Sequence, residues 1–522
     1  MQSEAPGRRL IFAVYLLAWS LAGMAAIYLA TYRFGAGLST DAVNNLAAAS
    51  HLLQGRGLVD VYGGPLVQWP PLYAWLLAAL SLLTGADVFQ VGWHLNALAF
   101  GASIFCTGLL IRHTFPDTPV FAYTGAPVIA TCLGIVQISA NIASDPLLLL
   151  FTVLFLIFAG RYGAQRRRRD LFWMGLAAVL GSFQRYAGLA LVVAGAGALV
   201  YIHRRRLPAA LARGAAFFVV AAAPIFAWGA FHNRPVTGQM FGSHLQADIP
   251  GNLYAAVEKL LYWFLPFSLI QRATPYAILG LLLVALLLLN RRGNWSEWFR
   301  LLASDGQIAS TLFFVIYGGM LVSYVSYSEH RNLESQRIHM VILPSLLLLI
   351  FSSIRELVPP RPASPALPRK QRALALLAAL WLVYPAAKLW DYESRSAGVE
   401  VSGTNLYNTA AIHEGNFLRA AQALPATGQA IYSNYEAPAW FYLRLDIGSV
   451  PRRVKGGALD PAGQAAFQAS TVQSGGGYLV WFNTVHIREN LPDPGQLEPL
   501  VKMEPALLSP AGDIYRLAPP GP

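Results

Sequence analysis

Two aspartates stand at the starts of apolar helical patterns and are the first candidates for chemistry. Asp41 lies in STDAVNNLAAASHLLQGRGL, a few residues beyond the first apolar run, and Asp145 lies in NIASDPLLLL. A carboxylate within hydrogen-bond reach of a hydroxyl group can take up its proton, so both are candidate general bases. The competing interpretation is structural, because Ser, Thr and Asp are favoured N-cap residues and an acid in a first helical turn interacts well with the helix dipole. Two acids at the entrances of apolar helices still favour function, because ionisable residues at membrane depth are usually functional.

Two arginines are candidates for binding a phosphate. Arg185 in GSFQRYAGLALV lies in the middle of a long apolar stretch, and Arg337 lies in SEHRNLESQRIHMVILP. A guanidinium group matches phosphate oxygens bidentately and offsets the charge that develops on a leaving phosphate. The alternatives are an arginine that reaches the lipid headgroups for Arg185 and a solvated charged loop for Arg337.

Four further residues are candidates for lining a substrate cavity. They are Trp69, Tyr73, His330 and Arg331. Trp69 and Tyr73 have a simpler interpretation as aromatic residues of the membrane–water interface. His330 and Arg331 belong to the charged loop that precedes Arg337, and solvation alone can explain such a loop.

A divalent metal ion is the one cofactor that the sequence leaves open. His330 and His339 show no recognised metal-site spacing, and Asp41 and Asp145 are the ligands we expect if a metal is bound. The chain has no P-loop, no dinucleotide-binding glycine pattern, no HExxH and no GxSxG. Nucleotide chemistry on the cytoplasmic side therefore has no support.

The composition is that of a polytopic membrane protein. Of 522 residues, 55% are hydrophobic and 12% are charged, whereas a soluble domain carries about 25% charged residues. The net charge of +12 comes from short basic runs between apolar segments. This is the positive-inside pattern and not a nucleic-acid-binding surface, so we expect no nucleic-acid partner.

The apolar segments define the elements that must position these residues. We predict eleven membrane spans, at residues 10–32, 91–112, 119–138, 145–163, 171–184, 187–202, 210–231, 275–290, 310–327, 338–353 and 373–390. The basic runs then lie in the cytoplasm with the N-terminus, and the C-terminus lies outside. The apolar run at residues 70–85 is short for a span, so we expect a re-entrant or interfacial helix there. The short pair 171–184 and 187–202 would place Arg185 at its external tip.

The chain beyond residue 390 changes in character. Apolar runs shorten, and GQAIYSN, GGGYLVWFN and GDIYRL read as short strands bounded by turn residues. EGNFLRAAQAL, before the first of them, has the pattern of an amphipathic helix. We therefore predict an α-helical membrane module over residues 1–390, with an external loop at 33–90, and an extracytoplasmic α/β domain over 391–522.

The order of these motifs resembles that of the GT-C membrane glycosyltransferases. An acid after the first span is followed by NNLAAASHLLQGRGL, by WPPLYAWLLAAL and, about a hundred residues later, by SDPLLLL. The chain is most similar to the branch of the lipid A aminoarabinose transferases and protein O-mannosyltransferases. QRYAGLAL resembles the basic residue and glycine of its short-helix pair, FHNRPVTGQMFG a loop of its bacterial members, and RIHMVILP a later basic segment. The resemblance covers most of residues 1–350.

This resemblance implies a function and a set of roles. The donor would be a sugar on a polyprenyl phosphate, and the reaction would take place on the external face. Asp41 would be the catalytic base or would orient the acceptor, and Asp145 would be the second acid, at the head of a helix. Arg185 would contact the donor phosphate, and Arg337 would make a second phosphate contact. Direct displacement of the lipid phosphate by a hydroxyl would invert the anomeric configuration.

The chain departs from this branch at two places. Gln68 and Trp69 stand where the aminoarabinose transferases have an acid and a lysine. That acid helps to bind a metal, so the departure argues against metal binding. Asp41 and Ala42 stand where the protein O-mannosyltransferases have a paired Asp-Glu, which argues against a protein acceptor.

Two other classes of protein remain open. A secondary transporter or lipid-linked-glycan flippase often shows internal repeats and charges at the bilayer midplane, and the chain shows no repeat. A surface polysaccharide polymerase or ligase would be expected to use a strongly basic external loop, and the loop 232–274 has only Arg234, Lys259 and Arg272. The expected partners are the lipid-linked donor, membrane lipid and an acceptor that is a glycolipid, a polysaccharide or a protein. The expected location is a bacterial plasma membrane.

Overall fold

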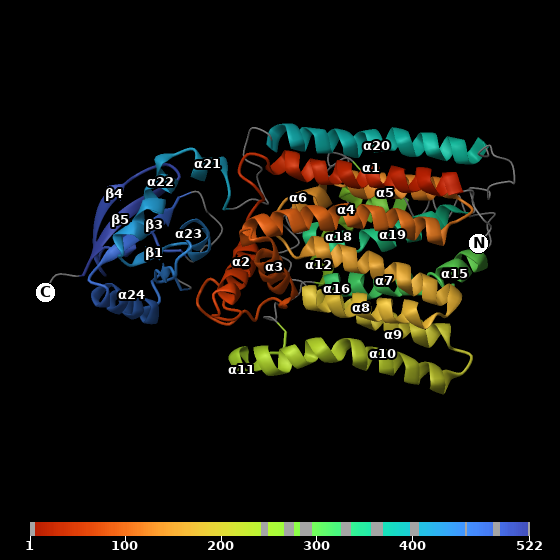
Figure 1. The fold of residues 1–522 in the computed structure, drawn as a ribbon, viewed down its shortest axis with the longest axis horizontal. Coiled ribbons are helices and arrows are strands. Elements are labelled where there is room, and N and C mark those ends of the chain that lie inside the picture. Colours follow the sequence, from red (N-terminus) through yellow and green to blue (C-terminus); the bar gives the residue numbers. More distant parts are fainter. Residues whose placement is uncertain are drawn as a thin grey trace. The chain divides into compact units, whose positions relative to one another are not determined.

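The computed structural model describes residues 6–241, 249–265, 276–281, 295–324, 336–355, 369–396, 407–454, 457–483 and 491–519. It divides into two compact units. The helical unit consists of Met1–Ala30, Val67–Tyr73 and Trp93–Ser394, and the mixed unit consists of Thr31–Leu66, Ala74–Gly92 and Arg395–Pro522. Figure 1 labels the elements of both.

The helical unit is built from apolar helices and short breaks between them. Its elements are α1 (Pro6–Thr31), α4 (Val88–Thr114), α5 (Pro119–Thr131), α6 (Leu133–Ser139), α7 (Asp145–Gln165), α8 (Arg168–Gln184), η1 (Tyr186–Gly188), α9 (Leu189–Ile202), α10 (Leu207–Trp228), η2 (Gly229–Asn233), α11 (Arg234–Thr237), α12 (Ile249–Tyr262), α15 (Trp295–Leu302), α16 (Ile308–Tyr324), α18 (Gln336–Met340), α19 (Leu343–Ile354) and α20 (Arg369–Ser396). Three of them, α1, α4 and α20, have between one and five terminal residues in the mixed unit.

Several of these helices are long and apolar enough to cross a membrane. Among the described residues there are five, namely Gly7–Thr31, Val88–Thr114, Asp145–Gln165, Leu207–Thr237 and Gln371–Ser394. The pair α5 and α6, bent by 53°, would make a sixth. The chain is therefore an integral membrane protein, as its composition predicts. Helices occupy ten of the predicted spans, several of them short, and the predicted span at 275–290 lies mostly outside the described residues.

The short apolar run before α4 forms a short helix. This is α3, Leu72–Thr84, with 13 residues. At 1.5 Å per residue it is about 20 Å long, less than the roughly 30 Å of a bilayer core. Its length agrees with a re-entrant or interfacial helix, and its position in the membrane stays a prediction.

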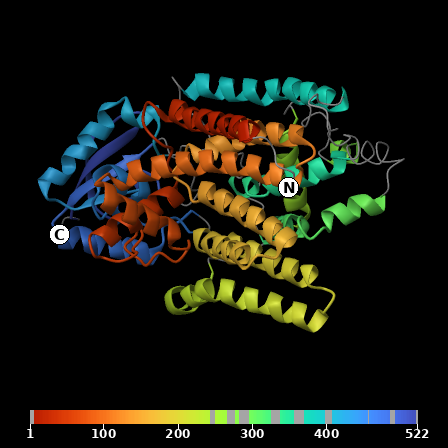
Figure 2. The ribbon, with the colours of Figure 1, turned by 45° about the vertical axis from the view of Figure 1, so that its right-hand side comes forward.

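Helices α7 to α10 follow one another as a layered group. Each of α7, α8 and α9 packs against the next helix along the chain, and α16 packs against α9. Both views show α7, α8, α9 and α10 in this succession (Figure 1, Figure 2). The group includes the N-terminus of α7 and the break between α8 and α9, where two of the predicted site residues lie.

The mixed unit contains a five-stranded sheet. Its strands are β1 (Ile431–Ser433), β2 (Gly448–Ser449), β3 (Gly477–Phe482), β4 (Lys502–Leu507) and β5 (Gly512–Ala518), in the order β2-β1-β3-β5-β4. The first three are parallel, and β5 is antiparallel to both β3 and β4. The three strands predicted from sequence are confirmed as β1, β3 and β5, and the predicted helix is confirmed as α22 (Asn416–Ala423).

Helices cover both faces of this sheet. Successive side chains of a strand point to opposite faces. Leu479 and Trp481 of β3 belong to one cluster with Phe467 of α24 (Pro461–Gln473). Phe482, on the other face, packs edge-on against Phe417 of α22, with the ring centroids 5.2 Å apart. The sheet therefore lies between two helical layers, and this confirms the predicted α/β fold.

The remaining helices of this unit come from both ends of the chain. They are α2 (Thr40–Leu53), most of α3, α21 (Ala410–His413) and α23 (Glu436–Leu443). Helix α2 packs against α23. The sequence predicts no such association between the loop after α1 and residues beyond 400.

Candidate functional site

Asp145 and Arg185 form a buried ion pair at the start of α7. Nη1 of Arg185 donates to Oδ2 of Asp145 at 2.8 Å and also to Oγ of Ser144 at 3.4 Å. The side chains of Asp145 and Arg185 are 2% and 18% exposed. A buried carboxylate is costly unless it is paired or hydrogen-bonded. Two residues predicted separately from sequence are thus brought together, and each explains the burial of the other.

Helix capping does not account for Asp145. The N-cap of α7 is Ser144, whose side chain makes no capping hydrogen bond, and Asp145 belongs to the first helical turn with Pro146 beside it. An acid in a first turn still interacts favourably with the helix dipole. Its carboxylate, however, is bound by a guanidinium group from another helix.

Arg185 occupies the break between two short helices, as its position in the apolar stretch predicts. Helix α8 ends at Gln184, η1 follows, and α9 begins at Leu189. Arg185 itself is extended, with φ −152° and ψ 143°. Gly188 makes the tight break possible, because a Cβ there would lie 2.1 Å from the carbonyl oxygen of Gly181.

Further hydrogen bonds tie this break to neighbouring segments. Nε2 of Gln184 donates to the carbonyl oxygen of Ser144 at 3.0 Å, beside the ion pair. The Tyr186 hydroxyl donates to the carbonyl oxygen of Val67 at 3.2 Å and accepts from Nδ2 of Asn233 at 2.7 Å. The segment after Val67, which contains the half-buried Trp69, and the FHNRPVTGQMFG loop are therefore both linked to the residue that follows Arg185.

Tyr73 supports the loop that leads into α7. It is 1% exposed, and its hydroxyl donates to Oδ1 of Asn96 at 3.1 Å. Nδ2 of Asn96 in turn donates to the carbonyl oxygen of Asn141 at 2.6 Å. These hydrogen bonds anchor the backbone of Asn141, in the segment that leads to the ion pair.

Helix α18, which carries Arg337, belongs to the same neighbourhood. Tyr317 of α16 is 2% exposed and donates from its hydroxyl to the carbonyl oxygen of Ile338 at 2.7 Å. Tyr317 lies near enough to Asp145 and Arg185 for their charges to act on its hydroxyl group. Arg337 is half-buried, and its helix packs against α6 and α7.

Three amide oxygens in these segments are buried without a donor. They are Oδ1 of Asn141, Oε1 of Gln184 and Oδ1 of Asn233, and none receives a hydrogen bond within the described part of the chain. Buried polar atoms in proteins are almost always hydrogen-bonded to protein, water or ligand. The three oxygens are therefore suited to accept hydrogen bonds from water or from the hydroxyl groups of a bound molecule.

Asp41 lies in the mixed unit, at the start of α2. The N-cap of α2 is Ser39, whose hydroxyl oxygen accepts from the backbone N–H of Ala42 at 3.3 Å. The carbonyl oxygen of Asp41 accepts from Nδ2 of Asn45 at 2.8 Å. Capping therefore falls to Ser39, and the half-buried carboxylate of Asp41 is not needed for it.

Residues from beyond position 400 hold the loop that leads to Asp41. Nδ2 of Asn408 donates to the carbonyl oxygens of Phe34 and Ala36 at 2.7 and 2.9 Å. The hydroxyl groups of Thr40 and Tyr407 lie 2.7 Å apart. The C-terminal part of the mixed unit thus fixes the backbone on which Asp41 stands.

A second carboxylate follows α2. Oδ1 of Asp60 accepts from the backbone N–H groups of Tyr62 and Gly64 at 2.9 and 3.0 Å. These bonds lower the pKa of Asp60, but its partial burial raises the pKa by more, so the net direction is upward. Asp60 is therefore part of a tight turn, held by two backbone N–H groups.

The side chains around Asp145 do not fit a metal site. No group of three or more His, Cys, Asp or Glu side chains gathers anywhere in the described ranges. The carboxylate of Asp145 is already bound by Arg185, and a neighbouring positive charge disfavours a cation.

Two predicted site residues, His330 and Arg331, lie outside the described residues. Several other residues of the candidate site are not predicted from the sequence, because their role depends on contacts that the sequence does not reveal. Gln184 and Tyr186 belong to QRYAG, and Asn233 belongs to FHNRPVTG, two motifs that the sequence did single out for other residues. Asn96 offers no such signal, because it is one of several polar residues in a largely apolar helix and belongs to no motif.

Comparison with protein families gives a match over the helices that carry this site. Residues 68–228 match the model of the dolichyl-phosphate-mannose-protein mannosyltransferase family. A comparison with curated protein sequences gave no match.

Solved structures of two membrane glycosyltransferases share the fold. ArnT from Cupriavidus metallidurans in the apo state aligns with a TM-score of 0.57 at 15% identity, over 98% of this chain and 98% of that one. ArnT bound to undecaprenyl phosphate aligns with a TM-score of 0.54 at 13% identity and the same coverage. The Archaeoglobus fulgidus oligosaccharyltransferase AglB, in complex with an inhibitory peptide and a dolichol-phosphate, aligns with a TM-score of 0.55 at 13% identity, over 92% of this chain and 70% of that one. These matches confirm the fold predicted from the resemblance to the GT-C membrane glycosyltransferases.

Proposed function

We propose that this protein transfers a sugar from a polyprenyl-phosphate donor to an acceptor hydroxyl group on the extracytoplasmic face of a bacterial plasma membrane. The observation that carries the proposal is the buried pair of Asp145 and Arg185 at a helix N-terminus. The matched mannosyltransferase family, and the solved relatives with bound undecaprenyl phosphate and dolichol phosphate, support a lipid phosphate as the donor group.

Arg185 binds the donor phosphate in this proposal. Only its Nη1 atom donates to Asp145 and Ser144, and Nε and Nη2 have no acceptor within the described residues. A guanidinium group has five N–H donors in a planar fork, so one edge can hold a carboxylate while the other binds a phosphate. Asp145 is then a positioning residue that fixes the plane and charge of Arg185. Arg337, on the adjoining α18, supplies a second positive charge.

Asp41 acts as the general base. Its carboxylate takes the proton of the acceptor hydroxyl group as the acceptor oxygen bonds to the anomeric carbon. The bond between the anomeric carbon and the phosphate oxygen breaks, and its electron pair leaves with the polyprenyl phosphate. Arg185 stabilises the negative charge on that phosphate. This single displacement inverts the anomeric configuration, and an α-linked product from an α-linked donor, seen by NMR, would refute it.

The acceptor belongs to one of three chemical classes, a glycolipid, a polysaccharide or a protein. The site chemistry is the same for each, because each presents a hydroxyl group. The Asp41-Ala42 sequence favours the first two classes, since it lacks the paired acids of the protein O-mannosyltransferases.

Activity in detergent separates a transferase from a transporter or flippase. Purified protein in detergent micelles is given polyprenyl-phosphate sugars and a membrane-lipid extract as acceptor. A transferase converts the donor without any sealed compartment, and we expect the sugar to leave the polyprenyl lipid. Donor movement that appears only in sealed vesicles, with no bond broken, would contradict the proposal.

A further inference from the structure

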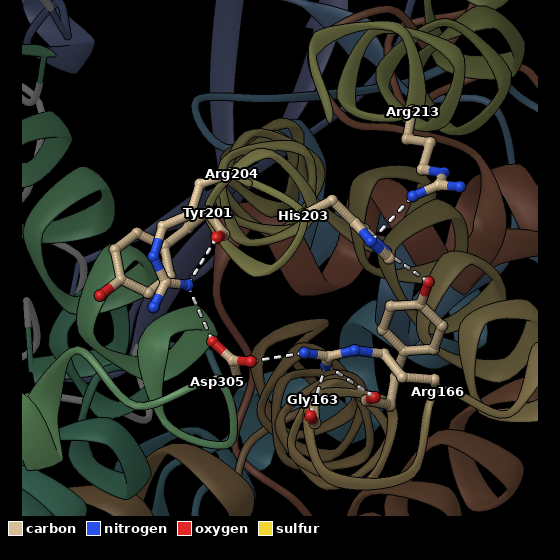
Figure 3. Close-up of polar contacts among 8 residues, drawn as sticks. Gly163, Arg166, Tyr201, His203, Arg204, Arg213 and Asp305 are labelled. Carbon is tan, nitrogen blue, oxygen red and sulfur yellow. Dashed lines mark hydrogen bonds and ion pairs between the residues drawn. The ribbon is translucent and has the colours of Figure 1, made fainter. Parts of the chain in front are cut away.

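A cluster of basic side chains lies at the end of the helical unit where α7, α9 and α10 meet their connecting loops. Nη1 of Arg204 donates to Oδ1 of Asp305 at 3.0 Å, and Nη2 of Arg166 binds Oδ2 of the same carboxylate. Figure 3 shows Asp305 between these two guanidinium groups. One carboxylate thus serves two arginines, and the cluster keeps a positive charge.

His203 links a third arginine to this cluster. Nη1 of Arg213 lies 2.8 Å from Nδ1 of His203, and Nε2 of His203 lies 3.0 Å from the Tyr162 hydroxyl oxygen. Desolvation, together with the charges of Arg213 and Arg166, lowers the pKa of His203. The neutral ring can accept from Arg213 through Nδ1 and donate to Tyr162 through Nε2, so it holds Arg213 in place (Figure 3).

A cavity opens directly beside these residues, between α8, α9 and α10. Its volume is about 790 Å³, within the usual range of small-molecule sites. The polar part of the lining is Tyr162, Arg166, Arg168, His203 and Arg213. The rest of the lining is apolar and includes Leu176, Val179, Leu199, Phe217 and Val220. The cavity is therefore basic at one end and apolar along the rest of its length.

The basic end lacks the carboxylates that would neutralise it. Arg168 and Arg213 both line the cavity and are exposed, and across the described ranges neither has a carboxylate within ion-pair distance. Arg166 has its one acid, Asp305, which it shares with Arg204. A ligand that brings negative charge to this end would form new charge-assisted hydrogen bonds.

The apolar part faces the region where lipid tails would lie. Phe172 lines the cavity on α8 and is 63% exposed, and Val220 lines it on α10 and is 73% exposed. Side chains this apolar and this exposed need a hydrophobic environment, which the lipid around a membrane helix supplies. The chain also concentrates basic residues here, at 166–169 and 204–206, and such runs mark the cytoplasmic side.

We propose that this cavity binds an anionic phospholipid of the cytoplasmic leaflet, with the headgroup phosphate held by Arg168 and Arg213 and one acyl chain lying in the groove between α8, α9 and α10. An apolar groove with two arginines at its basic end, neither of which has a carboxylate partner among the described residues, fits a lipid better than a soluble anion. A soluble anion would leave the groove unfilled, and a neutral lipid would leave the two arginines without a counter-charge. The proposal is independent of the transfer reaction.

The test is binding of defined lipids to the purified full-length protein, measured by native mass spectrometry from detergent. Phosphatidylglycerol and phosphatidylcholine of the same acyl composition are compared. We expect phosphatidylglycerol to bind about tenfold more tightly, and the double variant Arg168→Gln/Arg213→Gln to lose that preference. Each charge-assisted hydrogen bond contributes enough for such a change.

The matched control is Arg205→Gln. Arg205 is exposed in the same basic region but does not line the cavity, so its variant should keep the preference within about twofold. An equal loss in Arg205→Gln would overturn the proposal in favour of diffuse charge attraction.

A second variant tests the groove itself. Gly175 lines the cavity, and a Cβ there would lie 3.5 Å from Cε2 of Phe217, an ordinary contact. Gly175→Leu should fill the groove and weaken phosphatidylglycerol binding about tenfold. Unchanged binding in a folded Gly175→Leu protein would contradict an acyl chain in the groove.

Two competitors test the identity of the ligand. If glycerol 3-phosphate competes as well as phosphatidylglycerol does, the arginines bind a free anion. If undecaprenyl phosphate binds more tightly than phosphatidylglycerol, the cavity binds a polyprenyl lipid. Either result overturns the proposal.

Discussion

At the scale of single residues, the helical hairpin of α7 and α8 carries two buried acids, one near each end. Asp145 is paired with Arg185 at 2.8 Å, and Asp170 is paired with Arg161 at 3.2 Å. Both carboxylates are nearly inaccessible, with side chains 2% and 1% exposed. Both pairs join a buried carboxylate to an arginine, but only Asp145 also accepts a hydrogen bond from its partner, since the oxygens of Asp170 receive none within the described residues. Only the first pair lies at the break where the hydrogen-bonded segments of the candidate site converge. A comparison of variants in the two pairs can therefore separate an effect on activity from an effect on stability.

The first prediction compares Arg185→Gln with Arg161→Gln. Each variant leaves a buried carboxylate without its partner, which costs about 3–5 kcal/mol of stability. Both proteins should unfold at a lower temperature, but only Arg185→Gln should also lose sugar transfer, by at least about a hundredfold. Thermal unfolding in detergent and an initial-rate assay check this. Comparable residual activity in the two variants would place Arg185 among structural residues only.

The sequence points to the candidate site residues more readily than to the residues that they contact. Asp145, Arg185 and Asp41 are all recognisable from charge placement in a hydrophobic chain. That Asp145 and Arg185 bind each other is not recognisable, because 40 residues separate them and their contact depends on how α7 packs against α8. Capping was a reasonable alternative for both acids, but a serine provides the N-cap of each helix.

At the scale of elements, the break between α8 and α9 is the feature that accommodates a charged side chain inside an apolar stretch and brings it to its carboxylate partner. Its geometry depends on Gly188, since any side chain would collide with the backbone of Gly181. The sequence predicts the break from the shortness of both helices and from the cost of burying Arg185. It does not predict η1, which depends on this close approach.

The second prediction concerns Gly188→Ala. A Cβ 2.1 Å from the Gly181 carbonyl oxygen must push the two helices apart, which should displace Arg185 and lower both stability and transfer. The control is Gly319→Ala in α16, where a Cβ would meet nothing within 4 Å. That change should be neutral, or stabilising by about 0.5–1 kcal/mol through helix propensity. Full activity in Gly188→Ala would show that the break tolerates a wider separation.

The third prediction uses the raised pKa of Asp60. A carboxyl group with a raised pKa binds its proton more tightly in the folded state, so its contribution to stability is present below the ordinary pKa of about 3.9 and is lost as pH rises through the folded-state value. At neutral pH the buried charge is therefore a cost. Asp60→Asn keeps an oxygen for the N–H groups of Tyr62 and Gly64 and should raise the unfolding temperature at pH 7, with the gain shrinking near pH 4. A variant that is less stable than wild type at pH 7 would contradict this.

In the mixed sheet, the local sequence pattern predicts three of the five strands and misses the other two. Strands β1, β3 and β5 have apolar residues bounded by turn residues, and the sequence predicts them. Strand β2 has only two residues, and β4, KMEPAL, is a largely exposed edge strand that contains Pro505. Proline is tolerated at such an edge but argues against a strand when read locally.

At the scale of the whole molecule, the mixed unit joins the loop after α1 to the residues beyond 400. Asn408 and Tyr407 contact the backbone and side chains of residues 34–40. Arg56 forms an ion pair with Asp446 at 3.1 Å, so α2 is tied to the C-terminal part at its far end as well. The C-terminal part therefore supports the segment of Asp41, a role that the change of composition near residue 391 does not reveal.

The fourth prediction tests that support with Asn408→Ala. The variant loses the two hydrogen bonds from Nδ2, each worth about 0.5–1.5 kcal/mol net, and leaves the carbonyl oxygens of Phe34 and Ala36 without these donors. It also loses the contacts of Oδ1 with Nε2 of His413 at 2.6 Å and with the Tyr442 hydroxyl at 3.4 Å, so we expect a loss of stability as well. Transfer should fall about tenfold or more if the loop positions Asp41. Asn483→Ala, which removes one hydrogen bond to Ser509 at 3.1 Å near the sheet, should lower stability and leave the rate per folded molecule unchanged. Equal transfer rates per folded molecule in the two variants would show that the contacts of Asn408 do not contribute to catalysis.

The most direct test of the central claim is donor turnover by the purified protein and by Asp41→Asn. Each is incubated in detergent with a panel of radiolabelled undecaprenyl-phosphate sugars and an acceptor extract. Because Ser39 provides the N-cap of α2, Asp41→Asn should fold normally. We predict that wild type removes label from at least one lipid donor and that Asp41→Asn does not. If folded wild-type protein neither binds nor turns over any donor, or if Asp41→Asn turns over as fast as wild type, the proposed transferase mechanism is contradicted.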